Sequence, residues 1–381
     1  MQNRFFQLSL IFALIQLQAL GCLASVGQTN RRLALSQPLT ILWQHQSVDE
    51  QTTNLTSAAD SERIYLPLTR GVLLSMSVKD GSTLWRAETG GELSASPVAD
   101  GRGVYVASQT SYAGKLDARA NGALRLLGST TGVTLWMRTL PRPFRGSLAE
   151  NETTLFGGTE DGRVYAINKK TGGIVWTFQH TAEFASTPVL SGEQIYVGST
   201  DGVMFALQQE TGKPSWRYRT RGALPGAAVV SDGKIFFGSV DGYVYALQET
   251  NGKLRWRTRT GASVQSVALT INGVVAASFD NFVYSFSQQS GRQQWKRQLS
   301  GRIVAQPLAS DDGVLFAPLA GDACVVLSPR DGKQLNTLPV GADNNVSASP
   351  ILAGDVLIIT TRNGVLAFSP PANKPSTISN R

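Results

Sequence analysis

Tryptophan recurs along this chain at a nearly constant interval. Four of the six gaps between successive tryptophans are 39 or 40 residues. A fixed period of this length indicates a repeat protein, in which each repeat is one supersecondary unit that stacks on its neighbours. The 381-residue chain is also longer than a single hydrophobic core usually supports, and repetition of one unit meets that limit. The seven residues are Trp43, Trp85, Trp136, Trp176, Trp216, Trp256 and Trp295.

The sequence around the tryptophans predicts four short strands per repeat. Residues 195–216 read as an apolar strand, an Asp-Gly turn, an alternating strand, a Thr-Gly turn and a strand that carries Trp. Residues 235–256 repeat the order with Asn-Gly at the second turn. Such dipeptides favour hairpins because these turns need positive φ. A further strand precedes each unit, marked by Pro97, Pro188 and Pro350 in three copies. Four antiparallel strands in about 40 residues are typical of a propeller blade.

The ends of the chain set the number of blades. Leu335 lies 40 residues after Trp295 and gives an eighth position to the outer-strand series. The last unit has no Trp strand of its own, whereas the first Trp strand, residues 40–45, has no blade before it. We therefore predict an all-β, eight-bladed propeller over residues 39–369, closed when the N-terminal strand joins the C-terminal blade. The long gap between Trp85 and Trp136 places an insertion at residues 109–120.

The tryptophans themselves have a structural interpretation. One aromatic side chain at the same place in each blade fills the space between neighbouring blades, and no ligand is needed to explain it.

The N-terminus has the pattern of an export sequence. Arg4 is followed by an apolar stretch that ends in small residues, so residues 1–21 are predicted to be a signal peptide. Residues 19–22, Ala-Leu-Gly-Cys, resemble the bacterial lipobox and make Cys22 the candidate lipid attachment site. Ordinary cleavage after Gly21 or Ala24 is the alternative. Residues 22–38 and 370–381 are expected to be flexible tethers, and no segment is predicted to be a permanent membrane span.

The repeat resembles a known superfamily. Asp-Gly, Val-Tyr-Ala-Leu and Thr-Gly-Lys followed by Trp is similar to the repeat of pyrroloquinoline-quinone (PQQ) dehydrogenases and their non-enzymatic relatives, over residues 39–369. A short exported chain with a lipobox and eight blades resembles, within that superfamily, the BamB family of outer-membrane lipoproteins. This resemblance implies a monomeric scaffold that faces the periplasm and has the β-barrel assembly machinery or other envelope proteins as partners. A soluble periplasmic or extracellular protein is the alternative.

The resemblance to the BamB family also implies a partner-binding stretch in this chain. The BamB family has an aliphatic-x-aliphatic-Arg-Gly sequence after an outer strand, and Arg221 and Gly222 match its end. Tyr218 and Thr220 stand at the two aliphatic positions, so this chain departs from the pattern there.

Catalytic function has little support in the sequence. The resembling dehydrogenases need PQQ, calcium and an adjacent Cys-Cys pair, whereas the only cysteines here are Cys22 and Cys324. The repeated aspartates precede Gly in turns, where they serve turn geometry. The two histidines, His45 and His180, suggest no metal site. We therefore expect no catalytic residue, metal or cofactor. A PQQ-binding dehydrogenase, or a propeller that senses small molecules or polysaccharides, is the alternative.

The chain has a net charge of +8. Such a charge indicates either an anionic partner or a structural use of the basic residues. Export and the absence of a basic helix argue against nucleic acid. Basic residues alternate along successive predicted outer strands, as at Arg217, Arg219, Arg257, Arg259 and Lys296. The favoured interpretation is protection of exposed sheet edges against pairing. The alternative is a basic surface that faces acidic partners or lipid headgroups.

Overall fold

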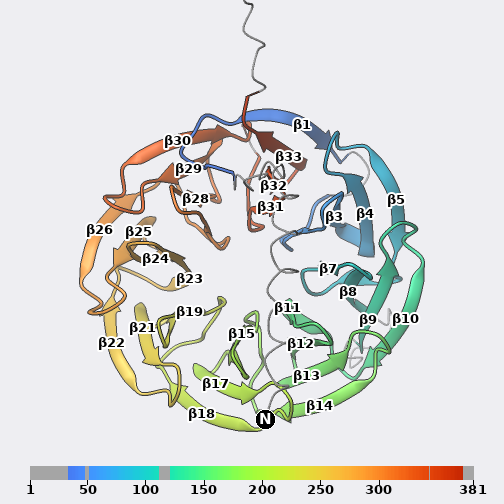
Figure 1. The fold of residues 1–381 in the computed structure, drawn as a ribbon, viewed down its shortest axis with the longest axis horizontal. Coiled ribbons are helices and arrows are strands. Elements are labelled where there is room, and N and C mark those ends of the chain that lie inside the picture. The colour runs from blue at the N-terminus through green and yellow to red at the C-terminus, as the bar shows by residue number, and fades with distance from the viewer. Residues whose placement is uncertain (1–32, 48–50, 111–120, 343, 372–381) are drawn as a thin grey trace, which may run out of the picture. The chain divides into compact units, whose positions relative to one another are not determined.

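Eight antiparallel sheets follow one another around a ring, each forming one blade (Figure 1). The computed structural model describes residues 33–47, 51–110, 121–342 and 344–371, which all belong to one compact unit that begins at Leu33. Strand order within each blade follows chain order except where the ring closes. The predicted all-β, eight-bladed propeller is confirmed. The signal peptide and Cys22 lie outside the described residues.

Blades 1 to 4 are formed by strands β2 to β18. Blade 1 contains β2 (Ala58–Ala59), β3 (Arg63–Leu68), β4 (Val72–Ser77) and β5 (Thr83–Glu88), with the 3-10 helix η1 (Thr69–Gly71) after β3. Blade 2 contains β6 (Glu92–Leu93), β7 (Val98–Asp100), β8 (Gly103–Thr110), β9 (Asn121–Gly128) and β10 (Thr134–Leu140). Blade 3 contains β11 (Phe144–Glu150), β12 (Thr154–Thr159), β13 (Arg163–Asn168) and β14 (Ile174–Gln179). Blade 4 contains β15 (Val189–Ser191), β16 (Gln194–Gly198), β17 (Val203–Gln208) and β18 (Pro214–Arg219).

Blades 5 to 8 are formed by the remaining strands. Blade 5 contains β19 (Val229–Ser231), β20 (Lys234–Gly238), β21 (Tyr243–Gln248) and β22 (Leu254–Arg259). Blade 6 contains β23 (Val264–Thr270), β24 (Gly273–Ser278), β25 (Phe282–Phe286) and β26 (Gln293–Gln298). Blade 7 contains β27 (Leu308–Ala309), β28 (Val314–Phe316), β29 (Ala323–Leu327) and β30 (Gln334–Pro339). Blade 8 contains β31 (Ile351–Ala353), β32 (Val356–Thr361), β33 (Gly364–Ser369) and β1 (Thr40–Gln46).

The two middle strands of each blade supply the core. In blade 5, β20 and β21 are buried over most of their length, because both faces of the blade pack against neighbouring blades. The outer strand β22 instead alternates between residues that pack inward and residues exposed to solvent. A period of two therefore marks the outer strands, and continuous apolar runs mark the middle ones.

Each tryptophan joins its blade to the next one along the chain. Trp216 in blade 4 donates from Nε1 to the carbonyl of Glu249 at 2.8 Å, in the turn between β21 and β22 of blade 5. Gly252 of the same turn lies against the Trp216 ring with φ of +67°, and a Cβ there would come within 2.5 Å of Cε3. The other six tryptophans make the same pair of contacts, so seven of the eight seams between blades share one joint.

The eighth seam, between blades 7 and 8, has a different joint. In blade 4 the residue opposite Ala206, just past a shift in register, is Trp216. The matching residue of β30 is Asn336, which lies opposite Val326. The prediction that Leu335 occupies the tryptophan position is therefore wrong by one residue. The same register shift occurs in both blades, but Asn336 lies 41 residues after Trp295, whereas the four preceding tryptophan spacings are 39 or 40. Leu335 is 42% exposed.

The N-terminal segment 33–38 completes this eighth seam. Asn336 Nδ2 donates to the carbonyls of Gln37 at 2.7 Å and Leu35 at 3.3 Å, while the Asp312 carboxylate accepts bonds from the amides of Leu35 and Ser36. Leu33 and Leu35 are buried in the core shared by blades 7 and 8. The tether predicted over residues 22–38 is therefore wrong for residues 33–38, because their leucines gain more by burial than a free segment would. The remainder lies outside the described residues.

The N-terminal strand closes the ring as predicted. β1 pairs antiparallel with β33, with Trp43 opposite Ala367 and Gln46 opposite Gly364. The predicted insertion at residues 109–120 starts two residues too early, because Gln109 and Thr110 belong to β8 and pair with Gly122 and Asn121 of β9. Its residues 111–120 lie outside the described part of the chain.

Two glycines of blade 5 test how much the joint contributes. Gly252 and Gly233 both have positive φ, of +67° and +66°, but only Gly252 faces a tryptophan, and the space around Gly233 is open. Gly233→Ala should cost about 1 kcal/mol, the backbone penalty alone. Gly252→Ala should cost about 1–3 kcal/mol more, because the methyl group overpacks the seam. Chemical unfolding of both variants measures the difference, and equal midpoints would contradict the role of the joint.

Candidate docking interface

The predicted partner-binding stretch, residues 218–222, leads out of β18 toward blade 5. Thr220 is buried, and its Oγ1 lies 2.9 Å from the carbonyl oxygen of Gly202 and 2.7 Å from that of Gly222. Thr89 and Thr260 make the same pair of contacts in two other blades. A hydroxyl group that recurs in this way fixes the turn after an outer strand. Thr220 therefore builds the loop and does not offer a contact to a partner.

Gly222 and Arg221 differ in what they offer to solvent. A Cβ on Gly222 would come within 2.5 Å of the Asp241 amide nitrogen, so only glycine fits there. The Asp241 carboxylate accepts a hydrogen bond of 3.1 Å from the Arg221 backbone amide and holds the tip of the loop in place. The Arg221 side chain itself is exposed, with no ion pair among the residues that the structure describes. Arg221 is the part of the motif that a partner can reach.

Tyr218 belongs to an aromatic cluster at the seam between blades 4 and 5. Its ring lies 5.9 Å from that of Tyr245, which in turn lies 6.1 Å from Tyr243. The Arg257 guanidinium stands 5.1 Å above Tyr243. Burial raises the pKa of Tyr218 above its ordinary value, so the phenol stays neutral. The Tyr218 ring therefore packs in the seam between blades 4 and 5.

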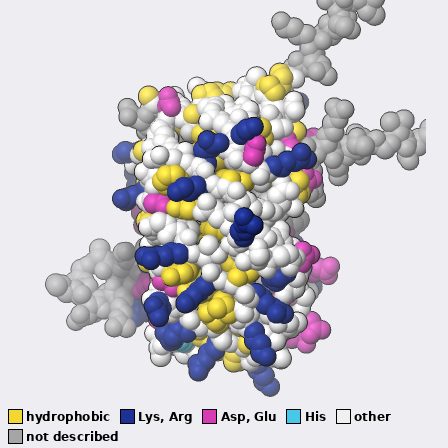
Figure 2. Space-filling model, turned by 90° about the vertical axis from the view of Figure 1, so that its left-hand side faces the viewer, with side chains coloured by type: hydrophobic (Ala, Val, Ile, Leu, Met, Phe, Trp, Pro, Cys, Tyr) yellow, Lys and Arg dark blue, Asp and Glu magenta, His cyan; other side chains and the backbone are white. Residues whose placement is uncertain are grey.

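Basic residues surround this loop on the outer strands. The alternating residues of β18 and β22 that point away from the core are arginines, at positions 217, 219, 255, 257 and 259. Figure 2, which shows the side of the ring that includes β22 and β26, has many Lys and Arg groups and few Asp and Glu groups. The sequence prediction included four of these five residues but missed Arg255, although it follows the alternation of β22. It also missed Arg297 of β26, which lies next to Lys296 and out of step with the alternation.

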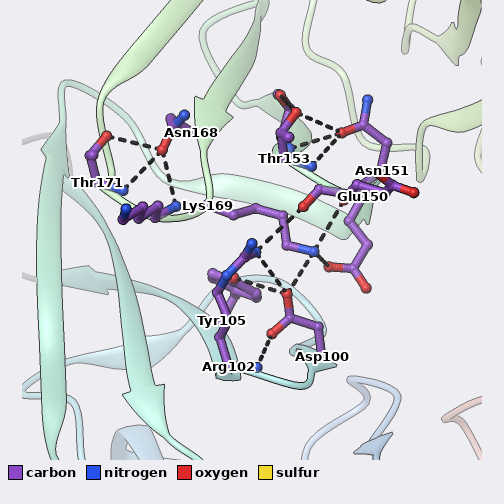
Figure 3. A network of polar contacts seen from close by, with 12 residues as sticks. Asp100, Arg102, Tyr105, Glu150, Asn151, Thr153, Asn168, Lys169 and Thr171 are labelled. Atoms are coloured by element: carbon purple, nitrogen blue, oxygen red, sulfur yellow. Dashed lines mark hydrogen bonds and ion pairs between the residues drawn. The ribbon is translucent and has the colours of Figure 1, made fainter.

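A buried lysine joins blades 2 and 3 and was not predicted from the sequence. Lys169 Nζ lies 2.7 Å from a carboxylate oxygen of Asp100 and 2.7 Å from one of Glu150, and 3.1 Å from the carbonyl of Asn151 (Figure 3). Its side chain is only 4% exposed. It follows β13 in the turn whose carbonyl binds Trp136. In the sequence it is one of two adjacent lysines in a turn, a pattern that normally indicates solvent exposure.

The charges around Lys169 stabilise one another. Burial alone would raise the pKa of Asp100, but hydrogen bonds from Lys169 and from the Arg102 amide outweigh it and hold the pKa below the ordinary value. Tyr105 adds a hydrogen bond of 3.2 Å to the same carboxylate. Because its groups are paired and buried, this network stabilises the seam and resembles no acid–base site.

Ser199, His180 and Asp201 lie together in the described part of the chain but are not arranged as a catalytic triad. Ser199 Oγ lies 2.5 Å from Asp201, and His180 Nε2 lies 3.1 Å from the same carboxylate, so the hydroxyl bonds to the acid and not to the imidazole. Burial raises the pKa of Cys324 to about 12, which keeps it a thiol. Within the described ranges, no three His, Cys, Asp or Glu side chains are grouped to hold a metal ion.

One cavity lies where the connections into the innermost strands of blades 1, 7 and 8 meet. It has a volume of about 480 Å³ and is lined by amide and hydroxyl side chains such as those of Asn54 and Ser347, with Arg362 as its charged group. Among the described residues, its wall has no carboxylate for calcium and no aromatic ring to stack on a quinone. The cavity therefore does not fit PQQ with calcium. No helix in the described ranges is long and apolar enough to cross a membrane.

A comparison with known protein families shows which family the chain belongs to. The family model described as outer membrane protein assembly factor BamB matches residues 23–126, 120–227 and 219–378, which is most of the chain. The chain belongs to the BamB family. Over 124 residues it is also 31% identical to BamB of Shewanella oneidensis, a match that covers 31% of this chain and 28% of that protein.

Solved structures share the fold of this BamB-family chain. BamB from Moraxella catarrhalis superposes with a TM-score of 0.71 at 16% identity, over 89% of this chain and 99% of that one. The designed protein Ika8 gives 0.73 at 15% identity, over 86% and 99%. A quinohemoprotein alcohol dehydrogenase from Pseudomonas putida gives 0.67 at 11% identity, over 87% and 76%. At these identities the likeness shows the fold alone, and scaffold and enzyme share it.

Neighbouring lysines of this BamB-family chain provide a test of the buried network. Lys169→Met should lower the free energy of unfolding by about 3 kcal/mol at neutral pH. The change leaves the half-buried Glu150 carboxylate without its cation and leaves Asp100 with only the longer ion pair to Arg102, at 3.5 Å. Lys170→Met, in the same turn but exposed, should change it by less than about 0.5 kcal/mol. Denaturant titrations of both variants measure these differences.

The stability difference between wild type and Lys169→Met should depend on pH. Because the pKa of folded Asp100 lies below its unfolded value near 3.8, its contribution is fully present above that pH. The contribution is lost as the pH falls through the lower, folded value. The stability gap between wild type and Lys169→Met should therefore narrow below pH 3.8, and a gap that stays constant would refute the proposed pairing.

Proposed function

We propose that this chain is a non-enzymatic docking scaffold that assists the assembly of β-barrel proteins into the outer membrane. Membership of the BamB family is the observation that carries the proposal. The fold supports it, because the repeated Trp, Asp and Gly residues are used in seams and turns. Specific contacts are left to the residues that do not repeat, and Arg221 is the clearest of these.

The contact itself is assigned to the tip of the loop after β18. Arg221 projects from a turn held by Thr220, Gly222 and Asp241, so its backbone is fixed before a partner arrives. A backbone that is already fixed lowers the entropy cost of binding, and the guanidinium favours carboxylate or carbonyl acceptors. Tyr218 packs in the seam between blades 4 and 5. The partner is a component of the β-barrel assembly machinery that offers an acidic or carbonyl-rich surface.

Affinity purification from solubilised envelopes tests this contact. The wild-type chain should recover components of the β-barrel assembly machinery, and Arg221→Glu should reduce the recovery at least several-fold by placing a repelling charge at the contact. Arg330→Glu is the matched control, because Arg330 is exposed in the turn after β29, at the opposite end of the strands. Failure of the wild-type chain to recover any component would overturn the function. Equal recovery by both variants would overturn the contact alone.

The proposal includes a lipid anchor at Cys22 that holds the propeller at the periplasmic face of the outer membrane. Cys22 lies outside the described residues, and the lipobox-like sequence 19–22 supports the assignment. The first described residue, Leu33, is fixed in the eighth seam, so only about a dozen residues separate it from Cys22. This length spans at most about 40 Å. An anchor at Cys22 would therefore keep the seam close to the bilayer.

Mass analysis of the mature protein tests the anchor. Its N-terminus should be an acylated Cys22, and Cys22→Ala should move the propeller from the membrane fraction to the soluble fraction. An unmodified N-terminus at Cys22, Leu23 or Ser25 would show ordinary export without lipid attachment. The purification experiment is independent of this result, since detergent releases the chain with or without an acyl group.

A further inference from the structure

Exposed cations are concentrated on the outer strands of three adjacent blades. β18, β22 and β26, called the outer wall below, have seven exposed Arg and Lys residues and no acidic residue. The cations of the outer wall are Arg217, Arg219, Arg255, Arg257, Arg259, Lys296 and Arg297.

Protection of sheet edges does not account for this distribution. All eight outer strands have a free edge, yet the outer strands of blades 2 and 3 expose aliphatic side chains instead of charges. Leu135 and Met137 of β10 are 58% and 53% exposed, and Val175 of β14 is 53% exposed. If charge served mainly to block pairing, these apolar strands would need it most. The cations of blades 4 to 6 therefore have a separate role.

The positive charge of the outer wall is only slightly neutralised from within. Arg219 is the one wall cation with an ion pair among the described residues, at 3.1 Å from Asp201. Arg257 and Lys296 lie over the rings of Tyr243 and Phe282, at 5.1 and 5.0 Å, which positions each cation without cancelling its charge. The outer wall thus presents several fixed, uncompensated cations to the surroundings.

The chemistry of the outer wall fits a lipid surface better than a protein. Stable protein interfaces are centred on buried aromatic or aliphatic anchors. On these three strands Leu254, 42% exposed, is the large aliphatic residue open to solvent, and it lies at the end of β22. An anionic bilayer needs no such anchor, because each Lys or Arg near its surface contributes about 1 kcal/mol through charge alone. Long basic side chains can also reach a flat surface from a curved wall.

We propose that the outer wall of blades 4 to 6 binds the anionic phospholipid headgroups of a membrane surface. The site is separate from Arg221 and from any acyl chain at Cys22, and its cations come from strands and not from loops. Contact through the wall places the ring on its side against the bilayer, so that both loop-bearing faces stay accessible. A scaffold held in this way can meet partners while it lies on the membrane.

Co-sedimentation with vesicles tests the proposal. The full chain carries Cys22→Ala in every sample, so that no acyl group enters the comparison. Vesicles contain phosphatidylcholine alone or phosphatidylcholine with phosphatidylglycerol. Binding should require phosphatidylglycerol and weaken as salt rises above 0.1 M, where the screening length falls to about 10 Å. The wall variant combines Arg217→Gln, Arg259→Gln and Lys296→Gln. It should bind about a hundredfold more weakly, since each of the three cations contributes a factor of about five at full contact.

A second triple variant separates position from net charge. Lys79→Gln, Lys170→Gln and Arg362→Gln remove the same charge from exposed turns of blades 1, 3 and 8, away from the outer wall, and this variant should bind like the parent chain. Equal weakening of both variants would overturn the proposal in favour of a general charge effect. Failure of the parent chain to bind phosphatidylglycerol vesicles would also overturn it and leave an acidic protein as the occupant. Neither result bears on the recovery of assembly components, which is measured in detergent.

Discussion

The contact of a tryptophan ring with the glycine of the next blade is the interaction on which the rest of the structure depends. A blade has two apolar faces and is not stable alone, so the ring exists only if every seam is filled. The indole fills the outer part of a seam, and its Nε1 donates a hydrogen bond to a turn carbonyl of the next blade. The glycine is required twice, for its positive φ and for the space that the ring occupies. Each repeat thus specifies the distance and orientation of the next.

This joint also explains why function has to be sought outside the repeat. Residues that recur in several blades, such as Thr220 with its counterparts Thr89 and Thr260, have been assigned to turns. Residues that are not repeated from blade to blade do not serve the common turns and seams. Three groups of them stand out: the loop tip at Arg221, the buried Lys169 network and the basic outer wall. Lys169 stabilises a seam, whereas Arg221 and the wall face solvent. Two exposed features on one rigid ring suit a protein that brings other molecules together.

The parts of the fold that could be predicted are those written in the repeat. The tryptophan period and the Asp-Gly turns depend on local geometry, so they indicated the strands, the blade count and the closure by residues 40–45. The eighth seam could not be predicted correctly, since the equivalent of the tryptophan position, Asn336, lies 41 residues after Trp295 and the regular spacing of 40 points to Leu335. The docking of residues 33–38 depends on Asp312, which lies almost 280 positions away in the sequence. The burial of Lys169 likewise depends on Asp100 from another blade.

Site-specific photo-crosslinking from position 221 in intact envelopes tests the central claim most directly, because it reports contact without solubilising the complex. A photoreactive residue at 221 should give a discrete adduct with a component of the β-barrel assembly machinery. The same residue at position 330, at the other end of the strands, should not give that adduct. Crosslinks from both positions to the same abundant envelope proteins, with no assembly component among them, would contradict the account of this chain as a scaffold that docks through the loop after β18.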